Sequence, residues 1–286
     1  LVDCVPAGVG IYASDVTLDL KGHTISCENT GMLSVGVEAG MRVPVQGVKI
    51  TNGYITGCAG GVLLAFAEDT SVTKITTWDN YAVDYEPFSG LGIFVFLSDN
   101  NVIMNNLIYE NEKYGISTLW ANGNLYKHNT VVENGIGGPD TSGIDLIGEN
   151  NSQILCNRVH GNGGGIVLAP DTDFGLSSSG NLVRGNVVMG NLSGISMLGF
   201  AWEGEYVFDI PGANTVRSNI VEDNNLNNFF EMYFDLAYGD ILPHPDGTCM
   251  NDWMKNQFGP PVLGPEGCFG TPVMLDDDDV CALDSD

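Results

Sequence analysis

The stretch NVIMNNLIYENEKYGISTLWANGNLYKHNTVVEN, residues 101–134, contains two copies of one repeating pattern, which indicates a solenoid fold. In each copy, three asparagines stand five residues apart and short alternating apolar segments separate them. The pattern continues downstream with a single serine substitution, and the full series is Asn101, Asn106, Asn111; Asn124, Asn129, Asn134; Ser152, Asn157, Asn162; Asn181, Asn186, Asn191; Asn214, Asn219, Asn224. Corresponding members lie 23 to 33 residues apart. This recurrence predicts a solenoid in which each repeat forms one coil.

A second phrase, a glycine followed by a β-branched residue, marks the first strand of each coil. It occurs at Gly10-Ile11, Gly36-Val37, Gly61-Val62, Gly92-Ile93, Gly115-Ile116, Gly143-Ile144, Gly165-Ile166 and Gly194-Ile195. Parallel strands joined in one continuous winding give right-handed connections. We therefore predict an all-β fold, a right-handed parallel β-helix of about eight coils that occupies residues 1–228.

Stacking places each asparagine about 4.8 Å above its counterpart in the previous coil. Side-chain amides can then hydrogen-bond along the column, so we expect the series to be inward and structural. Asn191 belongs to the series and should be buried, although Asn191-Leu192-Ser193 is a glycosylation sequon. The other sequon, Asn150-Asn151-Ser152, makes Asn150 the one credible glycosylation site.

The repeat fades from about Phe229, so we expect residues 229–275 to form a cap on the same domain and residues 276–286 to form an acidic tail. Cys249 and Cys268 should close this cap as a disulfide. The Asp276 to Asp279 run is compatible with calcium, although a solvated acidic tail is the competing interpretation. We expect no other cofactor and no further metal site.

The predicted coil register indicates which of the remaining cysteines can form a disulfide. Residues 22–27 (GHTISC) align with residues 53–58 (GYITGC), which predicts a Cys27–Cys58 disulfide between adjacent coils. Cys156 falls in a strand and should be a free core thiol. Cys4 and Cys281 remain without an assigned partner, and a bond between them would have to span the stack.

The charge balance restricts the partners. The formal net charge is −26, from 36 acidic and 10 basic residues, so nucleic acid and anionic membranes would be repelled. No apolar segment reaches the length of a membrane span. Seven cysteines, few lysines and two sequons favour a secreted, extracellular protein whose signal peptide has been removed.

The opening segment, Asp3-Cys4 followed by GIYASDVTLDLKGHTI at residues 10–25, resembles the first coil of extracellular parallel β-helix repeat proteins of the pectate-lyase-like superfamily, including NosD-like members. Cys249, Asn251, Trp253, Asn256, Phe258 and Cys268 are similar to the cap of these proteins. The resemblance covers nearly the whole chain. It implies the β-helix fold and a substrate on the first-strand face, but its members range from lyases, hydrolases and epimerases to binding and assembly proteins.

Alternation predicts which residues the first strands present outward. The predicted substrate-binding residues are Tyr12, Phe94, Phe96, Ser117, Leu119 and Trp202, the last from an insertion. This face is unusually apolar, so we expect something to cover it. The candidate covers are residues 84–90, 135–142, 171–180 and 199–212, the C-terminal segment, a second subunit or an apolar ligand.

Few polar groups lie on this face. Asp145 is its central carboxylate, Asp140 lies in the adjoining loop, and Glu38 lies toward the N-terminal end. Paired carboxylates can act as general acid and base on a glycosidic bond, so these three are the catalytic candidates, although a solvated strand residue is the competing interpretation of Asp145. The polygalacturonase motif is only loosely matched, because Ser142 stands where that family has an aspartate.

Three functions are compatible with these observations. The first is a secreted protein that binds or cleaves an extracellular polysaccharide in the manner of a lyase, hydrolase or epimerase. The second is a non-catalytic scaffold or assembly subunit that self-associates through the apolar face. The third is an enzyme that holds a small apolar substrate against that face.

Overall fold

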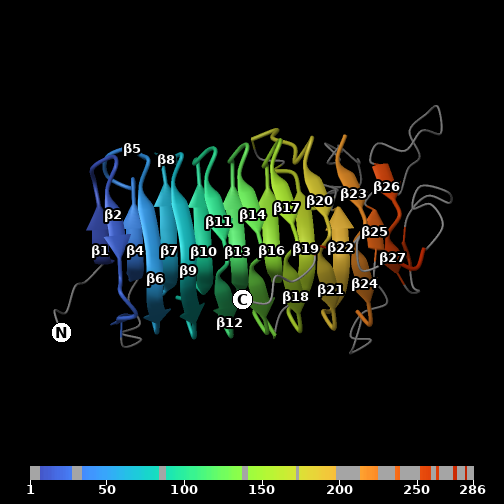
Figure 1. Ribbon diagram of the computed structural model, residues 1–286, viewed down its shortest axis with the longest axis horizontal. Helices are drawn as coiled ribbons and strands as arrows, with labels where there is room; N and C mark the ends of the chain where they lie inside the picture. Colours follow the sequence, from blue (N-terminus) through green and yellow to red (C-terminus); the bar gives the residue numbers. More distant parts are fainter. Residues whose placement is uncertain are drawn as a thin grey trace.

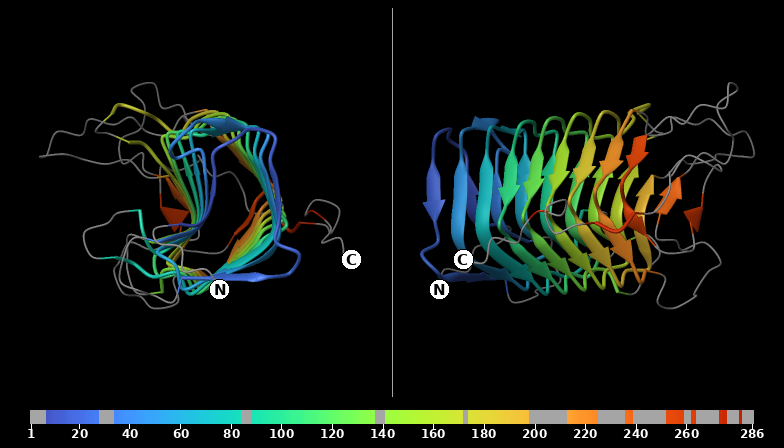
Figure 2. Two further views of the ribbon diagram at one scale, coloured as in Figure 1. Left: turned by 90° about the vertical axis from the view of Figure 1, so that its left-hand side faces the viewer. Right: turned by 45° about the vertical axis from the view of Figure 1, so that its right-hand side comes forward.

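The computed structural model describes residues 7–27, 34–83, 88–136, 141–171, 174–197, 213–224, 236–238, 252–258, 262–263, 273–275 and 281. Within these ranges the regular structure is β throughout, and successive coils follow one another along a single axis from β1 to β27 (Figure 1). Seen along that axis, the coils superimpose into one closed cross-section (Figure 2, left). The chain is a right-handed parallel β-helix, as predicted.

Three sheets make up the helix. The first has ten parallel strands: β1 (Ala7–Ile11), β4 (Val35–Ala39), β7 (Gly60–Ala65), β10 (Leu91–Phe96), β13 (Tyr114–Leu119), β16 (Ser142–Ile147), β19 (Gly164–Ala169), β22 (Ser193–Met197), β25 (Leu236–Tyr238) and β28 (Val262–Leu263). All eight predicted glycine phrases fall in these strands. The strands β25 and β28 extend the same ladder into the residues that we assigned to the cap.

The second sheet has sixteen strands and forms the other two sides of the coil. They are β2 (Thr17–Asp19), β3 (Thr24–Ser26), β6 (Lys49–Thr56), β9 (Ser71–Trp78), β11 (Val102–Met104), β12 (Leu107–Tyr109), β14 (Leu125–Lys127), β15 (Thr130–Val132), β17 (Gln153–Leu155), β18 (Arg158–His160), β20 (Leu182–Arg184), β21 (Val187–Met189), β23 (Thr215–Arg217), β24 (Ile220–Glu222), β26 (Asp252–Met254) and β27 (Gln257–Phe258). The strands β5 (Val45–Gln46) and β8 (Ala67–Glu68) form a small third sheet.

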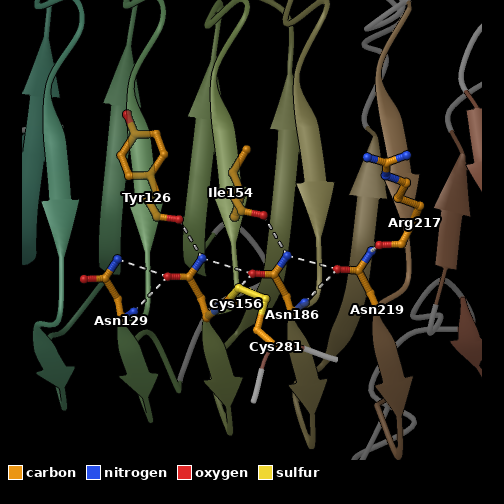
Figure 3. Close-up of a disulfide and its surroundings, with 9 residues drawn as sticks. Tyr126, Asn129, Ile154, Cys156, Asn186, Arg217, Asn219 and Cys281 are labelled. Atoms are coloured by element: carbon orange, nitrogen blue, oxygen red, sulfur yellow. Dashed lines mark hydrogen bonds between the residues drawn. A yellow bond between two sulfur atoms is a disulfide. The ribbon is translucent and has the colours of Figure 1, made fainter. Parts of the chain in front are cut away.

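The predicted asparagine columns stand at the corners of the coil and are buried. In the central column, Asn186 Nδ2 donates to the Ile154 carbonyl at 2.9 Å and to Asn219 Oδ1 at 3.0 Å. Its Oδ1 accepts from the backbone N–H and from Nδ2 of Asn157, at 2.8 and 3.0 Å (Figure 3). Each amide therefore satisfies backbone groups that the corner leaves without a strand partner.

The residue before each central asparagine turns the corner with a positive φ. The values are 57° at Asn105, 54° at His128, 58° at Cys156, 66° at Gly185 and 53° at Ser218. A single left-handed residue reverses the side-chain alternation, so the strands on both sides can point apolar residues inward. This explains why the asparagines stand five apart: each interval contains one three-residue strand, one left-handed corner residue and the next ladder residue.

The first coil corrects the predicted register. Gly10 pairs with Glu38, and Val9 pairs with Val37, so Gly8-Val9 is the true counterpart of Gly36-Val37. A Cβ on Gly8 would lie 2.5 Å from the Gly36 carbonyl oxygen. The two coils therefore approach each other so closely here that only glycine fits. Tyr12 is therefore displaced by two residues along the face from its predicted place.

Two disulfides lie within the described residues. Cys27 and Cys58 are bonded as predicted, with 4.8 Å between their Cα atoms. The prediction for Cys156 was wrong, because Cys156 is bonded to Cys281, 125 residues further along the chain (Figure 3). A corner residue points its side chain away from the core, so the thiol is available to a segment passing outside the coil. Cys4, Cys249 and Cys268 lie outside the described residues.

Candidate functional site

The outer face of the first sheet is the predicted working surface, and its central column runs straight across the coils. Strand register places Phe94 of β10 beside Ser117 of β13, Ser117 beside Asp145 of β16, and Asp145 beside Val167 of β19. All four side chains are buried although they point away from the core. Other side chains therefore cover much of this face.

Six aromatic side chains on this side, linked through ring contacts, form what we call the aromatic platform: Phe66, Phe88, Phe94, Phe96, Trp120 and Phe174. Phe88 stacks on Phe94 with 5.2 Å between centroids, and Trp120 meets Phe174 edge to face at 4.5 Å. Phe88 and Phe174 belong to two of the insertions that we expected to cover the face. They are themselves 48% and 65% exposed, so the platform has a large aromatic outer surface.

The platform extends to the coil that carries Asp145. A Cβ on Gly148, three residues after Asp145, would lie 3.1 Å from Trp120 Cδ1, so the indole lies over this coil. Trp120 Nε1 donates to Asp171 Oδ2 at 2.7 Å, which fixes the ring. Three residues of extended chain span about 10 Å, so the indole and the carboxylate lie about two sugar residues apart.

Asp145 is 5% exposed and lies between Ser117 and Val167 of the neighbouring strands. Burial raises the pKa of its carboxyl to about 7. Among the described residues, no cation or hydrogen-bond donor stabilises the ionised form of this carboxyl in place of the lost water. A carboxyl that titrates near neutrality can donate or accept a proton under ordinary conditions.

Ser142 lies on the same side of β16 as Asp145. A Cβ on Gly164 would be 3.0 Å from both the Ser142 Cβ and Val167 Cγ2. Ser142 pairs with Gly164, and Asp145 pairs with Val167. Since positions 164 and 167 face the same side of β19, Ser142 and Asp145 face the same side of β16. Within the described part of the chain, the buried Ser142 Oγ has no hydrogen-bond partner, so a ligand's hydroxyl could satisfy it.

Glu38 belongs to a separate group at the N-terminal end of the face. The Tyr12 hydroxyl donates to Glu38 Oε1, and Arg42 Nε lies 4.0 Å from the same oxygen. Four strand spacings, about 19 Å, separate Glu38 from Asp145 along the column. Carboxylates that act on one glycosidic bond stand within about 10 Å, so these two cannot form such a pair.

The structure also locates the other predicted site residues. Leu119 is half-buried between Phe96 and Ile147 in the neighbouring column of the face. Asp140 and Trp202 lie outside the described residues. Asn150 is half-buried, and its Oδ1 accepts from the Ser179 backbone N–H at 2.9 Å, so its glycosylation stays a prediction.

A buried carboxylate inside the coil was not predicted. Glu149 is fully buried, and its Oε1 accepts from Asn124 Nδ2 at 3.1 Å, the Tyr126 hydroxyl at 2.9 Å and the Ser152 hydroxyl at 2.5 Å. Burial raises the pKa of the Glu149 carboxyl, and the donors oppose that rise. Ser152 stands where the other coils have an asparagine in this column, and the Glu149 carboxylate accepts the hydrogen bond from Asn124 Nδ2 that the missing amide would accept. The serine was the feature of the sequence that could have indicated this change.

In the described ranges, no cluster of three or more His, Cys, Asp or Glu could hold a metal ion. The acidic run at residues 276–279, the predicted calcium candidate, is not among them. Nor does any helix in the described structure have the length and apolar character to cross a membrane.

Comparisons with known proteins agree with this architecture. Residues 3–142 match the family model described as "Right handed beta helix region". No curated protein matches the chain in sequence.

Three solved structures have similar folds. Alginate lyase from Paenibacillus sp. str. FPU-7 has 16% identity and a TM-score of 0.56, with 90% of this chain and 86% of that chain covered. The A-module of the Azotobacter vinelandii mannuronan C-5 epimerase AlgE4 has 14% identity and a TM-score of 0.56, with 88% and 62% covered. DFA-IIIase from Arthrobacter chlorophenolicus A6 in complex with DFA-III has 15% identity and a TM-score of 0.53, with 94% and 59% covered. These likenesses agree that the chain has the right-handed parallel β-helix fold.

Proposed function

We propose that this protein is an extracellular carbohydrate-active β-helix that binds a polysaccharide along the outer face of its first sheet and cleaves it with Asp145 as the proton-transfer group. The observation that carries the proposal is Asp145 itself, 5% exposed, without a described partner and on the same side of β16 as the unpaired hydroxyl of Ser142. A buried ionisable group without compensation destabilises a fold, so a functional reason is needed to explain it.

The aromatic platform supports the same proposal. The C–H edges of a sugar ring are apolar and weakly positive, and the faces of aromatic rings are apolar and negative, so the two surfaces pack well. The exposed ring of Phe174 offers such a face beside Trp120, which lies over the coil of Asp145, and Phe88 offers another on Phe94, two coils away. The fold likeness to an alginate lyase and a mannuronan epimerase is compatible with a glycan ligand.

The extracellular location is part of the proposal. Cys27–Cys58 and Cys156–Cys281 are disulfides, and such bonds persist in oxidising compartments.

The test is a panel of neutral and acidic polysaccharides incubated with the parent protein and with Asp145→Asn. We expect cleavage of at least one polysaccharide by the parent and its loss in Asp145→Asn with binding retained. Asp252→Asn is the matched control, since Asp252 is exposed in β26 on another side of the coil. If the parent neither cleaves nor binds any member of the panel, the proposal is wrong.

A second candidate function is a scaffold that self-associates through the aromatic platform, which its exposed rings favour. Light scattering after size-exclusion chromatography tests it: a parent dimer that Phe88→Glu or Phe174→Glu dissociates would support it. Tyr54→Glu is the control, because Tyr54 is 43% exposed on a different sheet. A parent that stays monomeric at high concentration contradicts it.

A further inference from the structure

The positions of the positive charges limit what the face around Asp145 can bind. The chain has ten basic residues, all within the described ranges: Lys21, Arg42, Lys49, Lys74, Lys113, Lys127, Arg158, Arg184, Arg217 and Lys255. All except Arg42 and Lys113 lie in strands of the second sheet or in turns between them. The strands β10, β13, β16 and β19, which make the middle of the face, therefore contain no lysine or arginine.

The two exceptions lie at the margins. Arg42 follows β4, pairs with Glu38 and has its guanidinium 5.4 Å from the centroid of the Tyr12 ring, about four coils from Asp145. Lys113 precedes β13 at the level of Gly90 and is engaged in contacts of its own. Neither provides a free cation beside Asp145.

The insertions that we expected to cover the face are acidic by composition. Residues 84–90, 135–142, 171–180 and 199–212 contain Asp84, Glu86, Asp140, Asp171, Asp173, Glu203, Glu205 and Asp209, with no lysine or arginine. The chain as a whole has a net charge of −26. A polyuronate would bring one carboxylate per sugar to a chain of strongly negative net charge and would meet no lysine or arginine in the middle strands of the face.

The environment of Asp145 leads to the same conclusion. A cation close to Asp145 would stabilise its ionised form, whereas the pKa of this carboxyl is raised by burial alone. The groups on the adjoining strands are the Ser117 hydroxyl and the apolar side chain of Val167, and the Ser142 hydroxyl projects from the same side of β16. These groups suit a ligand with hydroxyl groups and apolar C–H faces.

We infer that the substrate is an uncharged oligosaccharide and that the reaction is hydrolysis. The inference rests on the proposed function, because it takes Asp145 as the proton-transfer group. A neutral sugar has no carboxyl group to acidify its C5 proton, so β-elimination is closed to it. In hydrolysis the proton of Asp145 goes to the glycosidic oxygen as the C–O bond breaks, and water supplies the hydroxyl group to the anomeric carbon and a proton that restores the carboxyl.

The test compares three classes of oligosaccharide of matched length: neutral, uronate and amino-sugar. Each is assayed by calorimetric binding and by chromatography of products, at low and high salt, and the uronates also with added Ca²⁺. We expect the neutral class to bind with an affinity that salt changes less than twofold and to yield reducing ends without ultraviolet-absorbing unsaturated products. Asp145→Asn should retain binding and lose at least 100-fold in rate.

Trp120→Ala should weaken binding of the neutral class about tenfold, and Tyr54→Ala, from a different sheet, should leave it unchanged. If the protein prefers uronates or amino sugars and their cleavage still requires Asp145, the inference of a neutral substrate is wrong, but the proposed function stands. A parent that binds none of the three classes would overturn both.

Discussion

Replacing Asp145 with asparagine should stabilise the folded protein at alkaline pH and leave its stability unchanged in acid. Asparagine is close in shape to a protonated aspartate and never ionises. The parent must either keep a proton on Asp145 or hold a charge that is 5% exposed and without a described partner. The difference between the two proteins therefore isolates the free energy of ionising this one group.

The magnitude follows from the pKa. Burial raises the Asp145 pKa from 3.8 to about 7, and one pKa unit corresponds to about 1.4 kcal/mol. The group binds its proton more tightly in the folded state, so the parent loses stability as the pH rises from about 4 to about 7. Asp145→Asn escapes this loss and should be more stable by about 4 kcal/mol at pH 8, or by about 7 °C in Tm for a chain of this length.

Urea unfolding followed by circular dichroism at several pH values measures the effect. The curves of the parent and Asp145→Asn should coincide near pH 4 and separate progressively up to about pH 7. Asp252→Asn, which changes an exposed carboxyl, should follow the parent throughout. Equal stability of parent and Asp145→Asn at pH 8 would refute the claim that this carboxyl is buried without compensation.

Further predictions concern the structural framework. Asn186→Ala should lower the free energy of unfolding by about 4 kcal/mol in urea titrations, because it leaves buried partners of four hydrogen bonds unsatisfied; a loss below about 1 kcal/mol would show that the ladder matters little. Cys281→Ser should lower stability by about 5 kcal/mol in the same titration, since the disulfide closes a loop of 125 residues; reduction of the parent, which also breaks Cys27–Cys58, should lower it by more. Gly185→Ala should cost about 1 to 2 kcal/mol, because Gly185 has a φ of 66° and a Cβ would lie 2.9 Å from Cys281 Sγ; the cost should shrink in a Cys281→Ala background. Tyr126→Phe should lower stability by about 2 kcal/mol at neutral pH by removing a donor from buried Glu149, and an unchanged midpoint would contradict that role.

The repeat made most of the fold predictable. The five-residue spacing of the asparagines fixed the corners of the coil, and the buried columns through Asn129, Asn157 and Asn186 lie where the spacing placed them. Cys27–Cys58 was predicted although the aligned register was one residue off, since the structure sets Ile25 opposite Ile55. A disulfide tolerates such a shift because the side chains of neighbouring coils remain close together.

The errors came from features that the local pattern does not encode. Cys156 occupies a corner position at which other coils have asparagine, histidine, glycine or serine. Its disulfide partner, Cys281, is 125 residues away in the sequence, so the local repeat does not indicate the bond. Glu149 lies outside the repeating phrase, so only the serine at position 152 indicated a change in the ladder. Asp145 was identified from alternation, but its 5% exposure depends on tertiary packing over the face, which alternation does not encode.

Titration of the Asp145 side-chain carboxyl by carbon NMR measures whether this group can transfer protons in a glycan-binding face. With selectively labelled protein, and Asp145→Asn to assign the signal, we expect an apparent pKa near 7 that moves when a neutral oligosaccharide is added. A carboxyl that titrates near its ordinary pKa of 3.8 and does not respond to any oligosaccharide would show that Asp145 has no such role.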